Sequence, residues 1–166
     1  MDRKKTDCPS VFQSILLDTD GTVTDILRHI TGDDIAVTKI SQQISQAQEP
    51  ASLNLRTPQP ILQREILLTG RKHYLHADSM FVVDRMTQSM REGLLKSDTP
   101  VGLLWQRERL ESYREILARE TERNESLLQY FPDLKTNLFY KRSYLVYSGH
   151  QPLGLITERF PAEYFR

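Results

Sequence analysis

The chain has 166 residues, 39% of them hydrophobic, which is enough apolar content to form one ordinary folded domain. Lys and Arg number 22 and Asp and Glu also number 22, so the formal net charge at pH 7 is zero. This balance argues against a general electrostatic attraction to nucleic acid or to an anionic membrane. The single cysteine, Cys8, excludes an internal disulfide and a cysteine-rich zinc site.

Every apolar run in the chain is far shorter than a membrane span of about 20 residues. The basic start of the chain is not followed by the apolar core of a signal peptide. We therefore expect a soluble, cytoplasmic protein without membrane insertion. It is predicted to form a single domain over residues 1–166, with residues 1–10 as a flexible N-terminus.

The first segment, Ser10 to Ile30, is predicted to form two short helices that are interrupted at Asp20-Gly21. Ser10 and Thr22 are the expected N-caps, because a hydroxyl oxygen at that position accepts a hydrogen bond from an otherwise unsatisfied N–H group.

The next part of the chain is predicted to form strands. Residues 34–44 alternate between apolar and polar positions with one irregularity of register, and the polar, proline-bearing residues 46–60 are typical of a loop. Residues 61–68 and 74–83 are predicted to pair as a hairpin around a turn at Gly70. The strongest strand signal in the sequence lies in this hairpin.

A helix is predicted to follow the hairpin, with Asp84 as its cap and Lys96 as its last residue. Met86, Met90 and Leu94 recur every four positions, so they would form one buried stripe on such a helix.

The remaining chain adds further strands. Residues 101–105 are apolar and short, and residues 108–129 are so highly charged that the pattern does not decide between strand and helix. Residues 138–147 and 152–160 are predicted to pair as a second hairpin around the turn at 148–151. Hairpins with helices between them, without regular strand–helix alternation, predict an α+β fold with a largely antiparallel sheet.

Two charged residues lie within apolar rows of these predicted strands. Side chains alternate along a strand, so Arg64 shares a face with Leu62 and Ile66, and Glu158 lies in a similar row of the last strand. A charge that is buried alone costs several kcal/mol, so it must be paired or must meet a charged ligand. One interpretation is a structural Arg64–Glu158 ion pair, or strand edges that face water.

The other interpretation is a closed cavity in which Arg64 binds a carboxylate and Glu158 faces a hydroxyl group. A planar guanidinium matches a carboxylate with two parallel hydrogen bonds, which favours arginine for this task. Arg142 lies in a similar setting between Tyr140 and Tyr144 and is a third candidate for substrate binding.

A short motif from Ile15 to Asp25 suggests different chemistry. It resembles the first motif of the haloacid dehalogenase phosphatases, in which an aspartate nucleophile and a second aspartate two residues later help to hold magnesium. Asp18 and Asp20 would take those places. That family needs a parallel, doubly wound sheet, and the predicted hairpins favour a capped turn between two helices instead.

The four histidines are the other candidates for metal ligands: His29, His73, His76 and His150. His73 and His76 are three positions apart on a predicted strand, so their side chains point to opposite faces. We therefore expect no metal site and place these histidines at the surface or at hairpin ends.

Five separated segments together resemble the chorismate lyase (chorismate–pyruvate lyase) family over the chain from about Ile15 to Phe165. In chain order they are Leu16-Leu17 through Thr24, Leu62-Gln63-Arg64-Glu65-Ile66-Leu67-Leu68, Thr99-Pro100-Val101-Gly102, Arg142-Ser143 through Ser148-Gly149-His150-Gln151-Pro152-Leu153, and Thr157-Glu158 followed by Phe160-Pro161. No single segment is specific, and their common order carries the resemblance. The charged residues 108–123 are more similar to the divergent branch found in cyanobacteria and archaea.

This resemblance implies a six-stranded antiparallel sheet with helical flaps that enclose an internal ligand cavity. It implies the conversion of chorismate to 4-hydroxybenzoate and pyruvate without a metal or an organic cofactor, as a step that feeds quinone or other phenolic biosynthesis. The implied partners are only this substrate and this product, with a monomer favoured. The implied contacts are the side chains of Arg64 and Glu158 and the main chain at Val23 and Val101.

One departure from the family concerns the second strand of the first hairpin. The well-known bacterial enzymes have Gly-Arg-Thr where this chain has Ala77-Asp78-Ser79, so the tail of the substrate pocket is expected to differ. A non-enzymatic alternative also remains, because the ligand-sensing domain of GntR-type regulators resembles the same fold and binds small molecules. The match begins near residue 15, so we expect no DNA-binding domain before it.

Overall fold

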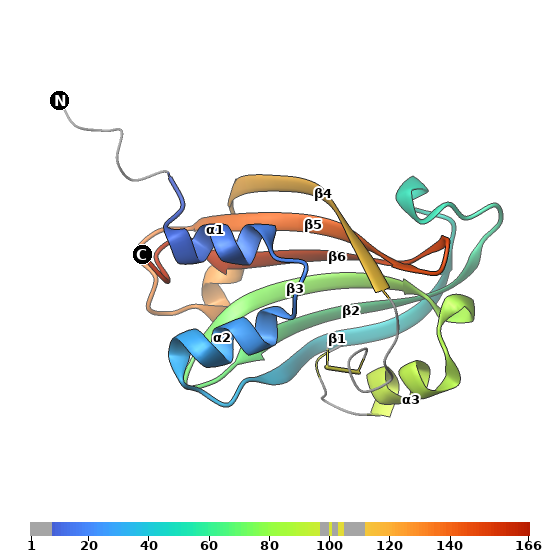
Figure 1. The fold of residues 1–166 in the computed structure, drawn as a ribbon, viewed down its shortest axis with the longest axis horizontal. Coiled ribbons are helices and arrows are strands. Elements are labelled where there is room, and N and C mark those ends of the chain that lie inside the picture. The colour runs from blue at the N-terminus through green and yellow to red at the C-terminus, as the bar shows by residue number, and fades with distance from the viewer. Residues whose placement is uncertain (1–7, 97–99, 101–102, 105–111) are drawn as a thin grey trace.

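Six antiparallel strands form one curved sheet in the computed structural model, which describes residues 8–96, 100, 103–104 and 112–166 (Figure 1). The strands are β1 (Ala36–Ala47), β2 (Gln59–Thr69), β3 (His73–Val82), β4 (Ser112–Arg123), β5 (Leu138–Ser148) and β6 (Gln151–Pro161). Their order across the sheet is β1-β2-β3-β6-β5-β4, and each neighbouring pair is antiparallel. The predicted α+β fold with a six-stranded antiparallel sheet is confirmed.

Three α-helices and three short 3-10 helices complete the described part of the chain. The α-helices are α1 (Val11–Asp18), α2 (Val23–Thr31) and α3 (Gln88–Lys96). The 3-10 helices are η1 (Ala51–Leu53), η2 (Val83–Arg85) and η3 (Ser126–Tyr130). None of the described helices is long and apolar enough to span a membrane.

Both predicted hairpins are present, as β2–β3 and β5–β6. Gly149, with φ of 62°, provides the left-handed residue in the tight β5–β6 turn. The predicted irregularity of the first strand is a register shift between Lys39 and Ser41 in the β1–β2 pairing. The predicted loop over 46–60 is shorter than expected, because β1 continues to Ala47 and β2 begins at Gln59.

The undecided charged segment contains strand β4, which pairs with β5 at one edge of the sheet. Its position at the edge explains its composition, since charged side chains on an edge strand remain in water and oppose pairing with another chain. Leu117 on this strand is exposed, as is Tyr113. The charged segment therefore lacks the apolar periodicity of a helix because it forms an edge strand.

The helix caps match the predictions only in part. The Ser10 hydroxyl accepts a hydrogen bond from the Gln13 N–H, and the Gln13 side chain accepts one from the Ser10 N–H, so a full capping box begins α1. Thr22 occupies the N-cap position of α2 without a side-chain capping hydrogen bond. Asp84 is not the cap of α3, because the chain first forms η2 and the hydroxyl of Thr87 accepts the hydrogen bond from the Met90 N–H.

One face of the sheet, here called the inner face, carries the helices. Helices α1 and α2 pack over one end of this face, with Leu16, Leu17 and Leu27 in the same apolar cluster as sheet residues. Helix α3 lies near the other end, where Met90 and Leu94 pack in a second cluster (Figure 1). The inner face is therefore covered from two ends.

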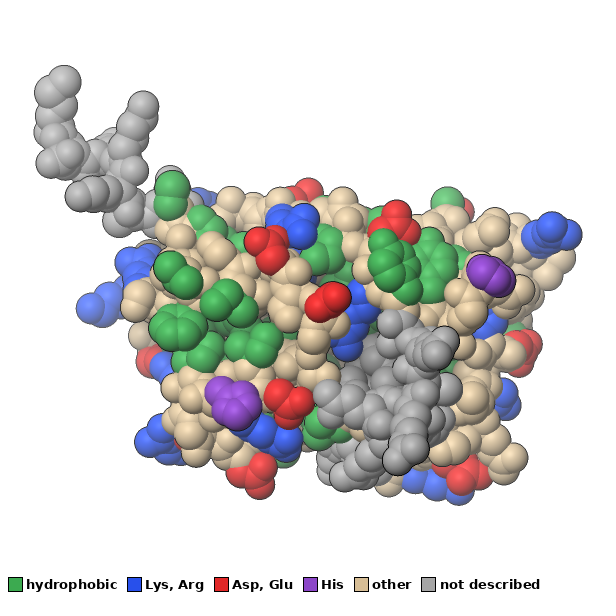
Figure 2. Space-filling model, viewed as in Figure 1, with side chains coloured by type: hydrophobic (Ala, Val, Ile, Leu, Met, Phe, Trp, Pro, Cys, Tyr) green, Lys and Arg blue, Asp and Glu red, His purple; other side chains and the backbone are tan. Residues whose placement is uncertain are grey.

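The outward side of α1 is also apolar. Val11, Phe12 and Ile15 are exposed, and hydrophobic surface lies over the α1–α2 region in Figure 2. The side chains that face the sheet are buried, so α1 is apolar on more than one side. The N-terminus predicted to be flexible was residues 1–10. Of these, Ser10 is the N-cap of α1, and residues 1–7 lie outside the described part of the chain.

The opposite, outer face of the sheet carries a ladder of ion pairs across its centre. The guanidinium of Arg159 on β6 bonds to Asp78 on β3 at 2.6 Å and to Glu122 on β4 at 2.8 Å. Lys141 on β5 lies between Glu120 and Glu122, with nitrogen–oxygen distances of 2.8 and 3.6 Å. These contacts join four of the six strands.

The ladder predicts how stability depends on pH. Burial alone would raise the pKa of the Glu122 carboxyl. Hydrogen bonds from Arg159 and Asn124 lower the pKa by a larger amount, so it lies below its ordinary value. A group of this kind stabilises the folded state fully above its unfolded-state pKa, and the contribution is lost as the pH falls through the folded-state pKa. Glu122→Gln is therefore expected to lower the urea midpoint at neutral pH and to have a smaller effect at about pH 3.

The matched control for this prediction is Glu92→Gln, which changes an exposed carboxylate on α3. Its effect on the urea midpoint should be small at both pH values. An effect of Glu122→Gln that stays equal at both pH values would show that the carboxylate charge does not matter.

Candidate functional site

A cavity that is partly open to solvent lies between the inner face of the sheet and the start of α2. Its wall is mainly apolar, with side chains from β2, β3 and β6: Ile66, Leu68, Leu75, Ala77 and Ile156. Three charged side chains also line it: Arg64, Arg114 and Glu158. An apolar cavity with a few convergent charges is typical of a small-molecule site.

The cavity exists because small residues lie in the middle of the floor. Arg64 on β2 pairs with Ser79 on β3, and Glu158 on β6 pairs with Ala77 on β3. The short side chains of Ala77 and Ser79 therefore lie between the two charged residues and leave space above them. Larger side chains at these two positions would fill the region between Arg64 and Glu158.

Glu158 is held by two donors from β5. The Nε of Arg142 donates to its Oε2 at 2.7 Å, and the hydroxyl of Tyr144 donates to its Oε1 at 3.0 Å. Arg142 lies directly opposite Glu158 in the β5–β6 pairing, so the ion pair follows from strand register. Arg142 is 1% exposed and Glu158 is 7% exposed, which makes this a buried ion pair.

Arg142 also ties the sheet to the turn between α1 and α2. Its Nη1 donates to the carbonyl oxygen of Thr19 at 2.7 Å, while its Nη2 is buried without a hydrogen-bond partner. The guanidinium carbon lies 4.9 Å from the centroid of the Tyr144 ring, within the range of a cation–π contact. The buried guanidinium of Arg142 therefore contacts the Glu158 carboxylate, the Tyr144 ring and the turn between α1 and α2.

The electrostatics of this group are set by burial and by the Glu158 charge. Burial raises the pKa of the Tyr144 hydroxyl, and the Glu158 carboxylate raises it further. Burial lowers the pKa of Arg142, but the neighbouring carboxylate outweighs this effect and raises it overall. Tyr144 is therefore a neutral hydrogen-bond donor and Arg142 a permanent cation, and both orient the oxygens of Glu158.

Arg64 lies on the cavity wall away from this pair. It is 4% exposed, and its Nε donates to the side-chain oxygen of Gln42 on β1 at 3.0 Å. Gln42 is directly opposite Arg64 in the β1–β2 pairing, so this contact orients the guanidinium across the neighbouring strand.

The structure thus places Arg64 and Glu158 in the wall of one cavity, and the alternative interpretation of an ion pair between them is wrong. Glu158 pairs with Arg142, which lies behind it and is not among the described residues that line the cavity. The physical reason is strand order, because β3 separates β2 from β6. Val23 at the start of α2 lines the cavity, whereas Val101 lies outside the described residues, although Pro100 beside it lines the cavity.

Two cavity residues were missed by sequence reasoning. Tyr144 is two positions after Arg142 and therefore shares its face, a signal that would have identified it. Arg114 lies on β4, in the segment whose secondary structure the pattern did not decide, so its face was not predictable.

The three residues that are expected to change the tail of the pocket face both sides of the sheet. Asp78 replaces an arginine of the well-known enzymes, but its side chain bonds to Arg159 on the outer face. Ala77 and Ser79, on either side of it, are the residues of this motif that line the cavity.

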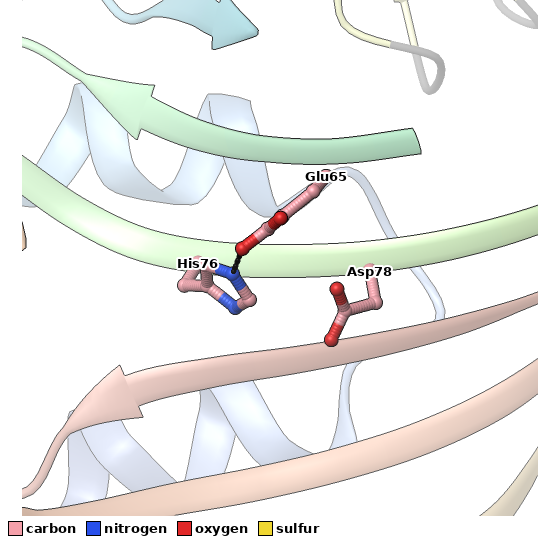
Figure 3. Close-up of side chains that lie close together, drawn as sticks. All are labelled: Glu65, His76 and Asp78. Carbon is pink, nitrogen blue, oxygen red and sulfur yellow. Dashed lines mark hydrogen bonds and ion pairs between the residues drawn. The ribbon is translucent and has the colours of Figure 1, made fainter. Parts of the chain in front are cut away.

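A second cluster, of Glu65, His76 and Asp78, lies on the outer face (Figure 3). Its ligand atoms lie within 4.8 Å of one another, and the Nε2 of His76 is 2.9 Å from Glu65. The expected surface position of His76 is wrong: it is 3% exposed, because the ring of Tyr130 in η3 stacks on it. One imidazole and two carboxylates suit a divalent cation, but Arg159 bonded to Asp78 would have to be displaced first.

The phosphatase-like interpretation of Asp18 and Asp20 is not supported by this fold. Asp18 is the last residue of α1, where it forms an ion pair with Arg119, and Asp20 lies in the following turn. Neither follows a buried parallel strand, because every strand pair in the sheet is antiparallel. A turn between two helices, without a side-chain capping hydrogen bond from Thr22, is the correct description.

Solved structures with this fold include an effector domain and a repressor domain of bacterial proteins. The effector domain of PhnF from Mycobacterium smegmatis has a TM-score of 0.66 and 13% identity, with coverage of 87% of this chain and 90% of that chain. The C-terminal domain of the histidine utilization repressor from Pseudomonas syringae has a TM-score of 0.60 and 16% identity, with coverage of 80% and 94%. These likenesses define the fold class.

The family is defined by sequence. The family model described as chorismate pyruvate-lyase Rv2949c-like matches residues 17–166, so this chain belongs to the Rv2949c-like chorismate pyruvate-lyase family. A protein of Mycobacterium leprae named chorismate pyruvate-lyase is 34% identical over 106 residues, which are 61% of this chain and only half (50%) of that protein. One of the same name from Mycobacterium tuberculosis H37Rv is 26% identical over 162 residues, 92% of this chain and 80% of that protein.

The buried Arg142–Glu158 pair makes a clear prediction for stability. Arg142→Met leaves the Glu158 carboxylate buried without its counter-charge, so it is expected to reduce the free energy of unfolding by about 3–5 kcal/mol. The double change Arg142→Met with Glu158→Leu removes both charges and should recover most of that loss. Urea unfolding followed by circular dichroism measures both.

The control is Arg119→Met, which breaks the more exposed ion pair with Asp18. It should cost no more than about 1 kcal/mol. A loss at Arg142 as small as the loss at Arg119, or a double variant less stable than Arg142→Met, would contradict the buried-pair description.

Proposed function

We propose that this protein is a chorismate lyase, which converts chorismate to 4-hydroxybenzoate and pyruvate. The observation that carries the proposal is the common cavity of Arg64 and Glu158 in a chain that belongs to a chorismate pyruvate-lyase family. The product would supply quinone or other phenolic biosynthesis.

In this proposal Arg64 binds the ring carboxylate of chorismate. Its planar fork of N–H donors matches a carboxylate, and Gln42 fixes the orientation of the guanidinium. Glu158 accepts a hydrogen bond from the ring hydroxyl on the opposite side of the ring. The main chain at Val23 and Val101 completes the contacts, and Arg142 acts as a positioning residue that holds Glu158.

The reaction breaks the ether C–O bond to the enolpyruvyl group and the C–H bond at the neighbouring, hydroxyl-bearing ring carbon. The electrons of that C–H bond complete the aromatic ring, and the departing enolpyruvate takes up a proton to become pyruvate. Because aromatisation provides the driving force, positioning of the substrate is a large part of the catalysis. When the substrate fills the cavity, the largely apolar wall leaves little room for water, which strengthens the charged contacts.

A second candidate is a non-catalytic domain that binds an aromatic carboxylate. The observation in its favour is the fold shared with the effector domain of PhnF and with other regulator domains. The same cavity and the same Arg64 contact would serve binding alone. Release of 4-hydroxybenzoate from chorismate by the purified protein, followed by absorbance, separates the two candidates.

Arg64→Ala is expected to lower kcat/KM for chorismate and to weaken the binding of 4-hydroxybenzoate. A charge-assisted hydrogen bond contributes about 1.5–3 kcal/mol, which corresponds to a loss of about ten- to a hundredfold. Arg64→Lys keeps the charge without the planar fork and should lose less. Enzyme kinetics and calorimetric titration with 4-hydroxybenzoate provide the measurements.

The control is Arg71→Ala, which removes an exposed arginine that pairs with Asp33 outside the cavity. It should leave kcat/KM unchanged. A folded Arg64→Ala protein with normal turnover, and only a lower melting temperature, would show that Arg64 has a structural role and not a catalytic one.

Chorismate turnover is also expected to continue after EDTA treatment. Glu158 is the one carboxylate among the described residues that line the cavity, and Arg142 and Tyr144 already bind its oxygens. The histidine-containing cluster lies on the other face of the sheet. Loss of turnover in EDTA with recovery in magnesium, together with loss in Asp18→Asn, would instead support chemistry at the α1–α2 turn.

A further inference from the structure

Two arginines line the cavity on different walls. Arg64 comes from β2 and Arg114 from β4, and strands β3, β6 and β5 lie between them in the sheet. Both side chains nevertheless line the same cavity. The proposed contacts to the ring of the substrate use Arg64 and Glu158 and leave Arg114 without a role.

Arg114 lies at the Glu158 end of the cavity. Its guanidinium carbon is 5.6 Å from the centroid of the Tyr144 ring, and the hydroxyl of Tyr144 donates to Glu158. Its Nη1 donates to the carbonyl oxygens of Asp20, at 2.8 Å, and of Gly21. The guanidinium is thus fixed between the α1–α2 turn and the sheet.

The charged side chains among the described residues of the wall are one carboxylate and two guanidinium groups. Glu158 is paired with Arg142 behind it, so that pair contributes no net charge. Arg64 and Arg114 are the other charged residues among the described residues of the wall, and both are cations. Cations that face a largely apolar cavity are stabilised by an anionic ligand that replaces the water they lose.

We propose that Arg114 binds the second carboxylate of the ligand, so that the cavity selects a cyclic dicarboxylate over a monocarboxylate. The inference rests on the proposed function, and it names the group that recognises the enolpyruvyl carboxylate of chorismate. That group is attached to the ring carbon next to the hydroxyl-bearing carbon, so it lies at the Glu158 end when Arg64 holds the ring carboxylate. Arg114 is the cation at that end.

This assignment separates substrate from product. Chorismate carries two carboxylates, and 4-hydroxybenzoate carries one. Arg64 and Glu158 contact groups that both molecules possess, whereas Arg114 contacts a group that leaves with pyruvate. Arg114 therefore strengthens substrate binding without strengthening the retention of 4-hydroxybenzoate.

The test compares two probes that cannot react. Benzoate carries the ring carboxylate alone, and 3-(1-carboxyvinyloxy)benzoate carries both carboxylates on a ring that is already aromatic. Calorimetric titration of the full chain should give tighter binding of the dicarboxylate. Arg114→Gln should weaken the dicarboxylate by about tenfold or more and change benzoate by less than about twofold. Arg114→Lys should recover part of the dicarboxylate affinity because it keeps the charge.

Arg119→Gln is the matched control, because Arg119 lies on the same strand and ties β4 to the same helical flap through Asp18, outside this cavity. It should change neither affinity. Equal weakening of both probes by Arg114→Gln would show that Arg114 only holds the turn, and no weakening of either would also overturn the proposal.

Turnover is measured on the same proteins. A rise in KM for chorismate in Arg114→Gln, with 4-hydroxybenzoate affinity unchanged, is the expected kinetic result. If the wild-type protein binds both probes and leaves chorismate intact, the proposed function fails, and the ratio of probe affinities still decides the role of Arg114. If the wild-type protein binds neither probe, both proposals fail.

Discussion

The buried ion pair between Arg142 and Glu158 is the interaction on which the cavity depends. Two charges taken out of water are tolerated only with good geometry and additional hydrogen bonds. Tyr144 provides a further bond to Glu158, and the Thr19 carbonyl accepts one from Arg142. Because Thr19 lies at the end of α1, the ion pair that orients the carboxylate also holds the helical flap over the sheet. The Arg142 guanidinium therefore couples the orientation of the Glu158 carboxylate to the position of the α1–α2 turn over the sheet.

The alternation of side chains lets one sheet perform two tasks. Glu158 faces inward to the cavity, and the next residue, Arg159, faces outward, where it links Asp78 and Glu122. Burial lowers the pKa of Arg159, but hydrogen bonds to those carboxylates raise it overall. The outer ladder stabilises the strands whose inner side chains form the cavity floor. This division allows small residues on the inner side, at some loss of packing there, because other contacts fix the strands.

Local patterns predicted the hairpins and helices well, because apolar periodicity and turn residues act over a few positions. The parity of Arg64 and Glu158 likewise placed both on the inner face. The alternation of side chains along a strand gives no information about the order of the strands in the sheet. It therefore did not reveal that β3 lies between the strands of Arg64 and Glu158, or that Arg142 is the neighbour of Glu158. Arg114 was missed for a related reason: an edge strand with charges on both faces has no periodic signal. The parts that remained unpredicted are those set by tertiary pairing.

A binding domain and an enzyme make opposite demands on one cavity. A binding domain benefits from every contact to its ligand, whereas an enzyme must release a product that shares most contacts with its substrate. Contacts by Arg64 and Glu158 alone would hold 4-hydroxybenzoate as well as they hold the ring of chorismate. A cation placed at the end of the cavity where the departing group lies adds affinity that vanishes with the reaction. In the proposed assignment Arg114, which lies beside Tyr144 on the cavity wall, would provide that cation.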